Sequence, residues 1–443
     1  MFLSNMPKQT PVNIFWFRRD LRLDDNAGLY HALKEGKNVL PLFIFDTEIL
    51  DKLENKADRR VQFIYQELER LQAELKTYGS SLLVKTGKPL EIWKQLTTDY
   101  SIENVYCNRD YEPYANERDE AVRKFLKENR SSLLQYKDHV IFENYEVLKD
   151  DGKPYTIFTP YSKKWNVKLS PFYSSSYPTL KYAKHFFKTD SMQLPSLTEI
   201  GFTKTDFIFP ARIVSHDIIK NYSDHRDFPA VNGTSKLGIH LRFGTLSIRK
   251  LLAYALERNQ TFVNELIWRD FYQMILFHFP QVVKHAFKRE YDGIEWENDE
   301  TKFIAWCEGN TGYPLVDAGM RELNATGYMH NRVRMVVASF LTKHLLIDWR
   351  WGEAYFAEKL LDFDLAANNG GWQWASGSGT DAAPYFRVFN PQLQMERFDP
   401  YLKYVKHWVP EFGTEAYPKP IVSHSEAREK VLVVYKKALS PQI

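Results

Sequence analysis

Apolar residues in the first third of this 443-residue chain occur as short runs separated by amphipathic stretches, a pattern that the rest of the chain lacks. The runs have the length of buried strands, whereas Arg59–Tyr78 repeats its apolar residues with a helical period and ends beside Gly79. Strands that alternate with helices are typical of a parallel, doubly wound sheet. We therefore predict a Rossmann-like α/β domain over residues 1–135. Its expected strands are Asn13–Phe17, Val39–Phe45, Leu82–Lys85 and Val105–Cys107.

The rest of the chain differs in composition and period. Residues 136–205 are rich in Pro, Ser, Tyr and Lys, which predicts a long linker rather than a domain core. From residue 206 to residue 443 the pattern is helical almost throughout, so we expect an all-α domain there. Most of the 11 Trp lie between Trp268 and Trp374, in this helical half. Such a concentration of rings predicts large cores, flat binding platforms, or both.

Charge and cysteine content exclude several classes of protein. The 59 Lys and Arg against 56 Asp and Glu give a net charge of +3, which by itself does not indicate nucleic-acid binding. Two cysteines, Cys107 and Cys307, cannot build a disulfide framework or a Cys-rich zinc site. The segment before Pro11 lacks the apolar run of a signal peptide, and no 18-residue apolar stretch occurs. We therefore expect a cytoplasmic protein without a membrane partner.

The usual phosphate-binding motifs are absent from the sequence. Phe17–Asp20 stands where a dinucleotide-binding fold would carry GxGxxG, and no GxxxxGK[ST] occurs. Gly233–Gly238 is a different candidate, because it is small, hydroxyl-bearing and basic and precedes a helical pattern. Backbone amides and hydroxyls at the start of a helix can hold phosphate. An ordinary N-cap and turn would explain the same residues and is the commoner case.

Two helical segments carry side chains that could bind a ligand. Phe262–Phe271 and the residue after it place four such side chains on one face, namely Glu265, Trp268, Arg269 and Tyr272. The alternative there is an amphipathic helix with a Glu–Arg pair that contributes only about 0.3–0.5 kcal/mol. Met329–Leu346 has an apolar face and a second face of mostly small residues, which would leave space for a ligand. An interior helix of a bundle would also explain that segment.

The segment Leu360–Trp374 is the least ordinary part of the chain. Asp362 and Asp364 precede Asn-Asn-Gly-Gly, which is poor helix material, and two Trp follow. No His cluster or further carboxylate lies near the Asp pair, so we expect no metal site. Acceptors and amides beside indoles suit a flat heterocycle that carries ring N–H groups. A capped turn between helices would explain the Gly and Asn but not the two Trp.

Five motifs in order resemble the cryptochrome/photolyase family, and specifically its class I cyclobutane pyrimidine dimer photolyases. The motifs are WFRRDLRLDDN (Trp16–Asn26), GTSKL (Gly233–Leu237), NELIWRDFY (Asn264–Tyr272), GYPLVDAGMRELNATGYMHNRVRM (Gly312–Met335) and NNGGWQWASGSGTDAAPYFRVFNP (Asn368–Pro391). The likeness runs from about residue 13 to near the C-terminus. It implies an α/β antenna domain, a linker and an all-α domain that binds FAD.

The resemblance also implies which residues hold the flavin. Its phosphates and ribose would be held by Tyr222, Thr234, Ser235, Lys236, Leu237 and Gly238, with Phe262 and Arg269 nearby. The isoalloxazine edge would contact Arg334, Asp362 and Asp364, and Asn368 would face flavin N5. The Asp pair would then accept hydrogen bonds instead of binding metal. An electron-transfer chain would run outward from the flavin through Trp372, Trp349 and Trp296, for which core packing is the alternative explanation.

The implied activity is light-dependent repair of pyrimidine dimers in UV-damaged DNA. The dimer pocket would be formed by Glu265, Trp268, Asn331, Arg332, Met335 and Trp374, and the DNA backbone would meet Arg226, Arg387 and Gln394. Flipping the dimer out of the duplex costs about a few kcal/mol, which indole stacking at about 1–3 kcal/mol per base can offset. Photoexcited reduced FAD would lend the dimer an electron, and Glu265 would stabilise the dimer radical anion with a hydrogen bond or a proton.

Two other functions are alternatives to repair. A signalling cryptochrome of the plant type tends to carry an acid where this chain has Asn368, and a long tail where this chain ends at Ile443. The (6–4) photolyases carry paired histidines where the corresponding helix here has Asn331 and Met335, and cryptochromes of the DASH type usually lack the WQW string. A flavin electron-transfer protein without repair activity is the second alternative; it would need no lesion pocket.

The sequence says less about the antenna chromophore than about the flavin. Folate-binding members of the family carry an Asn-Glu pair soon after a Tyr-Glu, whereas this chain has Tyr114-Ala115 after Tyr111-Glu112-Pro113. This difference argues against folate and leaves a deazaflavin, a second flavin or no antenna. A monomer is the default for the family.

Overall fold

The computed structural model describes residues 11–440, which form two compact units that we treat separately. Of the described residues, the first unit contains 11–143, Leu169–Arg212 and Leu237–Tyr254. The second contains Asn144–Lys168, Ile213–Lys236 and 255–440. The expectation that no leader precedes Pro11 concerns residues that lie outside the described range.

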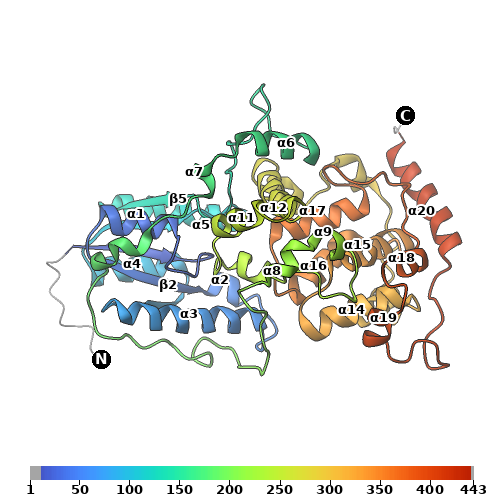
Figure 1. Ribbon diagram of the computed structural model, residues 1–443, viewed down its shortest axis with the longest axis horizontal. Helices are drawn as coiled ribbons and strands as arrows, with labels where there is room; N and C mark the ends of the chain where they lie inside the picture. Colours follow the sequence, from blue (N-terminus) through green and yellow to red (C-terminus); the bar gives the residue numbers. More distant parts are fainter. Residues whose placement is uncertain (1–10, 441–443) are drawn as a thin grey trace. The chain divides into compact units, whose positions relative to one another are not determined.

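The first unit is built on a five-stranded parallel sheet with strand order β3-β2-β1-β4-β5 (Figure 1). The strands are β1 (Val12–Phe17), β2 (Val39–Asp46), β3 (Leu83–Gly87), β4 (Ile102–Asn108) and β5 (Ser132–Tyr136). Every residue of β1 and β2 is buried, as expected for continuous apolar runs in a parallel sheet. The predicted α/β architecture is therefore confirmed, and β5 is a strand that the sequence analysis did not identify.

Helices cover the sheet because alternate strand residues point to opposite faces. Ile14 and Trp16 pack in one core cluster with residues of α4 (Pro89–Asp99) and α5 (Pro113–Glu128). The predicted helix at Arg59–Tyr78 is observed as α3 (Arg59–Thr77). The remaining helical elements of this unit are α1 (Ala27–Glu35), α2 (Thr47–Leu50), α7 (Pro171–Ser174), η1 (Thr179–His185), α10 (Gly238–Arg242) and most of α11 (Ile248–Leu256).

A buried ion-pair cluster ties distant parts of the first unit together. Arg249 donates from Nε to Asp25 Oδ1 over 2.9 Å and from Nη2 to Asp138 Oδ1 over 2.6 Å. Arg22 Nη2 lies 2.7 Å from the other oxygen of Asp138. All four side chains are at most 7% exposed, so each charge depends on its partners for solvation.

The second unit is helical, and within residues 11–440 every strand precedes residue 137. Its longer helices are α6 (Phe158–Lys168), α12 (Gln260–His278), α13 (Glu300–Glu308), α14 (Pro314–Thr326), α15 (Asn331–Ser339), α16 (Trp349–Lys359), α17 (Leu365–Ser376), α18 (Pro391–Phe398) and α20 (His424–Leu439). Shorter elements are α8 (His216–Lys220), α9 (Tyr222–His225), η2 (Pro280–Val283), η3 (Arg289–Gly293), η4 (Phe340–His344) and α19 (Lys403–Trp408). Its main core packs apolar residues of α14, α15, α16 and α17 together. Residues 136–205, the expected linker, include α6, which belongs to this unit.

The expectation that Asn368–Gly371 is poor helix material is wrong, because these four residues lie inside α17. Asp364 caps this helix by accepting from the amide of Ala367. A Cβ on Gly370 would overlap the ring of Tyr272, and a Cβ on Gly352 of α16 would overlap the indole of Trp372. Close packing against α12 and α16 therefore outweighs the low helix propensity of the four residues.

In the part of the chain that the structure describes, no helix is long and apolar enough to cross a bilayer. The same residues contain no group of three or more His, Cys, Asp or Glu that could hold a metal ion.

We predict that Asp138→Ala lowers the free energy of unfolding by about 3–5 kcal/mol, because it leaves the buried guanidinium of Arg22 without an anion and removes one of the two carboxylate partners of Arg249. Burial would raise the pKa of Asp138, but Arg22 and Arg249 hold it well below its usual range. The contribution is therefore complete above the ordinary Asp pKa of about 3.9 and is lost as the pH falls through the folded-state pKa.

Urea unfolding of the first unit at pH 7 and at acid pH measures this difference. Asp24→Asn is the matched control, because Asp24 is an exposed partner of Lys250 and should contribute less than about 1 kcal/mol. An Asp138 variant as stable as the wild type at pH 7 would contradict the assignment.

Candidate functional site

Two adjacent residues connect the helices that carry most of the expected lesion pocket. Arg226, directly after α9, forms an ion pair with Glu265 of α12. Its neighbour Asp227 accepts from Arg332 Nη2 of α15 over 2.7 Å. The structure therefore brings Arg226, Glu265 and Arg332 into one site. The local Glu–Arg pair considered for α12 is not the contact observed, since the partner of Glu265 is distant in sequence.

The carboxyl group of Glu265 has an unusual environment. Burial raises its pKa, and the neighbouring charge of Arg226 opposes this increase without cancelling it. A carboxyl with a raised pKa keeps its proton to higher pH than an exposed glutamate and can then donate a hydrogen bond. Glu265 accepts from Arg226 through Oε1, and its raised pKa therefore favours the protonated form in which it could donate to a bound group.

Trp268 lies on an aromatic platform. Its indole stacks on Phe158 of α6 with ring centroids 3.6 Å apart and planes 3° apart, and Tyr272, one turn further along the same face of α12, has its ring centroid 5.5 Å away. Phe158 comes from the expected linker, where no pattern marked it as part of a site. The helix that carries Trp374, α17, packs against α12 through Gly370 and Tyr272, so both expected stacking indoles lie on neighbouring helices.

The start of α15 presents the other expected lesion residues. Asn331 is exposed as the first residue of the helix, and the guanidinium of Arg332 lies over the ring of Phe398 at 4.4 Å. Arg332 Nη1 also lies 3.8 Å from the sulfur of Met335. His330 caps this helix by accepting from the amide of Arg332. Asn331, Arg332 and Met335 thus occupy one end of α15, beside Asp227.

Besides Arg226, the candidates for contact with the DNA backbone lie after α17. Arg387 is exposed, and its guanidinium lies 5.7 Å from the ring of Phe389. Phe389 is in turn 6.5 Å from the indole of Trp374, so Arg387 is connected to the expected pocket through one aromatic ring. Gln394 is a half-buried residue of α18.

Expected flavin residues gather around Tyr328. Thr234 Oγ1 and Tyr328 Oη are 3.0 Å apart, Lys236 Nζ lies 5.3 Å from the Tyr328 ring, and the Arg334 guanidinium lies 5.7 Å from the same ring. Arg334 donates to both oxygens of Asp362 over 3.2 and 3.0 Å. Tyr328, which sequence reasoning did not assign a role, therefore links the Gly233–Lys236 segment to the Arg334–Asp362 pair.

The other flavin candidates have varied surroundings. Tyr222 packs edge-on against Phe262 with centroids 5.1 Å apart. Asp364 accepts from Gln273 Nε2 over 2.9 Å. Ser235 and Arg269 are half-buried residues of the second unit. Leu237 and Gly238 belong to the first unit, where Leu237 is buried and Gly238 begins α10.

Asn368 presents an acceptor beside an open face of α17. Its Nδ2 donates to the backbone carbonyl of Glu353 over 3.0 Å, which directs Oδ1 away from that contact. A Cβ on Gly371, one turn further along, would meet nothing within 4 Å. Nearby on α12, Gln273 Oε1 is buried without a hydrogen-bond partner among the described residues. An isoalloxazine ring, which is flat and has N–H and carbonyl groups on its edge, fits this donor and acceptor set together with Arg334 and Asp362.

The three expected electron-transfer tryptophans differ in burial. Trp372 and Trp349 are 2% and 1% exposed, whereas Trp296 is half-buried and packs 6.1 Å from Tyr435. Trp372 also contacts Phe356 at 5.0 Å and Trp306 at 6.1 Å. Its Nε1 has no hydrogen-bond partner in residues 11–440. The sequence analysis did not single out Trp306, because a buried indole in a helix has no distinctive pattern.

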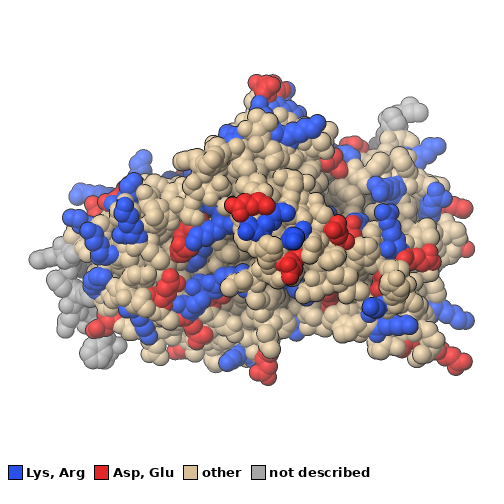
Figure 2. Space-filling model, viewed as in Figure 1, with Lys and Arg blue, Asp and Glu red and all other residues tan. Residues whose placement is uncertain are grey.

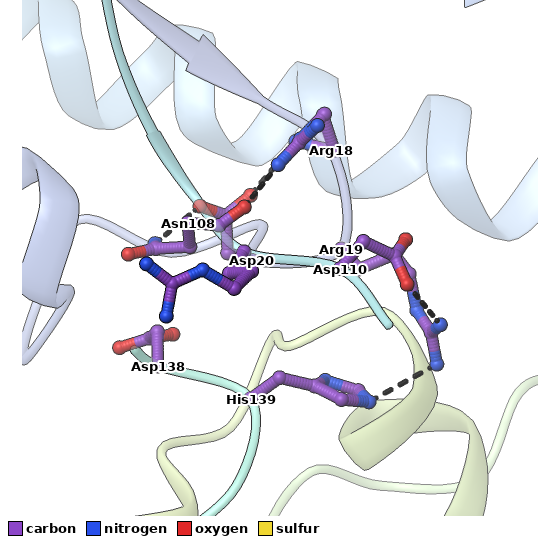
Figure 3. A pocket seen from close by; sticks show the side chains of 8 residues that line it. Arg18, Arg19, Asp20, Asn108, Asp110, Asp138 and His139 are labelled. Atoms are coloured by element: carbon purple, nitrogen blue, oxygen red, sulfur yellow. Dashed lines mark hydrogen bonds and ion pairs between the residues drawn. The ribbon is translucent and has the colours of Figure 1, made fainter. Parts of the chain in front are cut away.

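The first unit has a hollow at the carboxyl ends of β1 and β4, where open parallel sheets commonly bind ligands (Figure 3). The enclosed space is about 10 Å³, room for about one water molecule, and it lies among charged residues including Arg18, Asp110 and His139. Arg19 contacts Asp110 at 3.1 Å and His139 at 3.1 Å, as Figure 3 shows. Tyr114, at the position where folate-binding relatives differ, donates to Asp46 over 2.6 Å.

Comparison with known proteins identifies the family of the chain. A family model described as DNA photolyase matches residues 13–180, and one described as the FAD binding domain of DNA photolyase matches residues 262–415. The deoxyribodipyrimidine photo-lyases of Halobacterium salinarum and Escherichia coli are each 37% identical to the chain, covering 96% of it and 99% of themselves.

Two solved structures show the same architecture. A bacterial class III photolyase from Agrobacterium tumefaciens is 32% identical with a TM-score of 0.87, and 98% of this chain and 99% of that chain are covered. An archaeal photolyase from Sulfolobus tokodaii, solved with two FAD molecules, is 36% identical with a TM-score of 0.82, and 97% and 100% are covered. With this identity over nearly its whole length, the chain belongs to the DNA photolyase family.

Proposed function

We propose that this protein repairs cyclobutane pyrimidine dimers in UV-damaged DNA by light-driven electron transfer from reduced FAD to a flipped-out dimer. The observation that carries the proposal is the double ion pair of Arg226 and Asp227, which joins Glu265 of α12 to Arg332 of α15. It gathers a hydrogen-bond donor, basic side chains and the Trp268 platform in the same unit as the Arg334–Asp362 pair. Relatives named deoxyribodipyrimidine photo-lyase support the dimer as substrate.

The protein's own residues would hold and orient the cofactor. Reduced FAD supplies the light-excited electron when it is bound. Thr234 and Lys236 offer a hydroxyl and a positive charge for its phosphates, and the Arg334–Asp362 pair offers a donor and an acceptor for its ring edge. Because Nδ2 of Asn368 donates to the backbone carbonyl of Glu353, its Oδ1 would be left to accept a hydrogen bond from a ring N–H. These groups position and tune the flavin, while the electron chemistry belongs to the cofactor.

The dimer would be held by stacking and by charge. Stacking on Phe158, with ring centroids 3.6 Å apart, fixes the orientation of the Trp268 indole. Its other face would stack on a pyrimidine ring. Stacking of about 1–3 kcal/mol per base is comparable to the few kcal/mol needed to flip a dimer. Arg226, Arg387 and Gln394 would contact the DNA backbone, and protonated Glu265 would donate to the carbonyl oxygen where negative charge develops.

The buried tryptophans suit a different step. Trp372 and Trp349 lie in the core and Trp296 near the surface, so the three would pass electrons inward to reduce oxidised FAD before repair. They are not needed once the flavin is reduced. Photoreduction of oxidised FAD and repair of the dimer would therefore depend on different residues of the same unit.

We further propose a monomer that acts on DNA in the cytoplasm and carries a second, light-harvesting chromophore in its first unit. Both cysteines are free thiols, consistent with a reducing compartment. The carboxyl ends of β1 and β4 are the place we assign to this chromophore, because open parallel sheets commonly bind ligands there, and the Sulfolobus tokodaii photolyase holds a second FAD molecule. Sedimentation and an absorption spectrum of the native protein test these two points.

Blue light should restore intact thymines in a dimer-containing oligonucleotide when the protein carries reduced FAD. Glu265→Ala should lower the repair yield per absorbed photon several-fold, because it removes the donor to the dimer. The wild-type yield should fall as the pH rises through the raised pKa of Glu265, whereas Glu265→Gln, which keeps a donor, should show no such step. Chromatography of the repaired strand measures both effects.

No repair by fully reduced wild-type protein would refute the enzymatic function and favour a photoreceptor or an electron-transfer protein. An oligonucleotide with a (6–4) lesion is the substrate control and should not be repaired. The same mixture kept in the dark is the control that shows whether repair requires light.

Trp372→Phe should slow photoreduction of oxidised FAD by at least about tenfold, because phenylalanine is much harder to oxidise than tryptophan and cannot act as the hopping site. Repair by chemically reduced variant should stay within about twofold of wild type. Transient absorption measures the first step and dimer repair measures the second. Trp408→Phe, outside the expected chain, is the matched control. Loss of repair in the pre-reduced Trp372 variant would show that the two roles are not separate.

A further inference from the structure

Lys343 is a buried lysine beneath the segment that carries Arg387. It lies in η4, a turn of π-helix that continues α15, and it is only 2% exposed. Its Nζ donates to the backbone carbonyl of Arg387 over 2.9 Å, although the two residues are 44 positions apart. Turns of π-helix inside α-helices are frequent at functional sites. No sequence motif distinguishes this lysine from those on exposed helix faces.

The surroundings of Lys343 contain positive or neutral groups. The charged group that faces it from the neighbouring segment is the Arg387 guanidinium, and no carboxylate within residues 11–440 forms an ion pair with it. On its own element the neighbour is His344, whose Nε2 lies 2.8 Å from Nδ1 of His424 at the start of α20. Burial and then the charge of Arg387 lower the pKa of Lys343 to about 8. A buried ammonium without an anion is costly. Lys343 and Arg387 together are therefore suited to bind an anion.

The segment above Lys343 is held at two points and exposes the residues between them. Tyr385 and Val388 pack against the core cluster that contains Tyr291 and Tyr435. Between them, Phe386 is 61% exposed and Arg387 is also exposed. The hydrogen bond from Lys343 fixes the carbonyl of Arg387 between these two anchors. The lysine therefore sets the backbone from which both exposed side chains project.

We propose that Lys343 is a positioning residue for DNA binding, which holds the Arg387 backbone from below and adds its charge to a phosphate site at Arg387. The inference rests on the proposed function, in which Arg387 contacts the DNA backbone. A phosphate bound there would stabilise the ammonium of Lys343. Above neutral pH, DNA binding would then be accompanied by proton uptake at this residue, and affinity would fall as the pH rises past 8.

Lys343→Met keeps a straight side chain of similar size but removes the donor and the charge. We expect it to weaken binding of dimer-containing and undamaged duplexes alike, on the order of tenfold, as for loss of a phosphate contact. The repair yield at saturating DNA should be unchanged, because the dimer pocket is intact. Lys343→Arg should restore much of the affinity. Lys437→Met, which removes an exposed lysine paired with Glu295, is the control for loss of one charge.

The pH profile separates this role from a merely structural one. Wild-type affinity at fixed salt should fall between pH 7 and pH 9, and the Lys343→Met profile should be flat in that window. Calorimetry in two buffers of different ionisation enthalpy should show uptake of up to about 0.5 proton per bound duplex at pH 8 in the wild type. This measurement needs no variant, so it decides the question even if Lys343→Met does not fold.

Wild-type affinity and pH profile in Lys343→Met, or absence of proton uptake in the wild type, would overturn the proposal. Arg387→Ala distinguishes its failure from failure of the proposed function. If Arg387→Ala weakens DNA binding and Lys343→Met does not, only the role of Lys343 is refuted. If Arg387→Ala leaves binding unchanged, the proposed DNA-binding face is refuted as well.

Discussion

The close approach of α12, α16 and α17 is the constraint on which the second unit depends. Gly370 lets α17 lie against the Tyr272 ring of α12, and Gly352 lets α16 accept the Trp372 indole. Because a single aromatic ring packs on a glycine at each crossing, Tyr272 on Gly370 and Trp372 on Gly352, α17 is fixed in depth and rotation. That rotation places Asn368 and Trp372, which lie one turn apart, against α16, where Asn368 donates to the Glu353 carbonyl and Trp372 packs on Gly352. Asn368, expected to face the flavin, and Trp372, expected to carry electrons, are thus positioned by the same helix.

Local charge arrangement matters more than the net charge of the chain. The total of +3 hides a chain of ion pairs from Glu265 through Arg226 and Asp227 to Arg332. Lys343 and Arg387, in contrast, have no carboxylate partner in the structure's described range. Figure 2 shows the same principle on the visible face, where basic and acidic side chains lie interspersed over a largely uncharged surface. Affinity for a polyanion would therefore depend on a few placed arginines and lysines rather than on overall basicity.

Sequence patterns predicted the sheet and the main helices well, because both depend on the local period of apolar residues. Strands β1 to β4 and helix α3 begin and end within a few residues of the predicted ranges. Helix α17 was missed because Asn-Asn-Gly-Gly has low helix propensity, whereas its formation depends on packing of Gly370 against Tyr272 of α12 and of Trp372 against Gly352 of α16. The partner of Glu265, the stacking of Phe158 on Trp268 and the burial of Lys343 all join residues far apart in the chain. No local pattern encodes such contacts, and the resemblance to photolyases supplied the site residues that composition alone could not.

The most direct test of this account is the flavin content and stability of Gly370→Ala. The added methyl group would overlap the Tyr272 ring, so we expect the free energy of unfolding of the second unit to fall by about 1–3 kcal/mol and FAD binding to fall with it. Gly371→Ala adds the same methyl group one residue later, where it meets nothing within 4 Å, and controls for helix propensity in the unfolding measurement. A Gly370→Ala protein with wild-type stability and a full complement of FAD would contradict the claim that this helix crossing shapes the site.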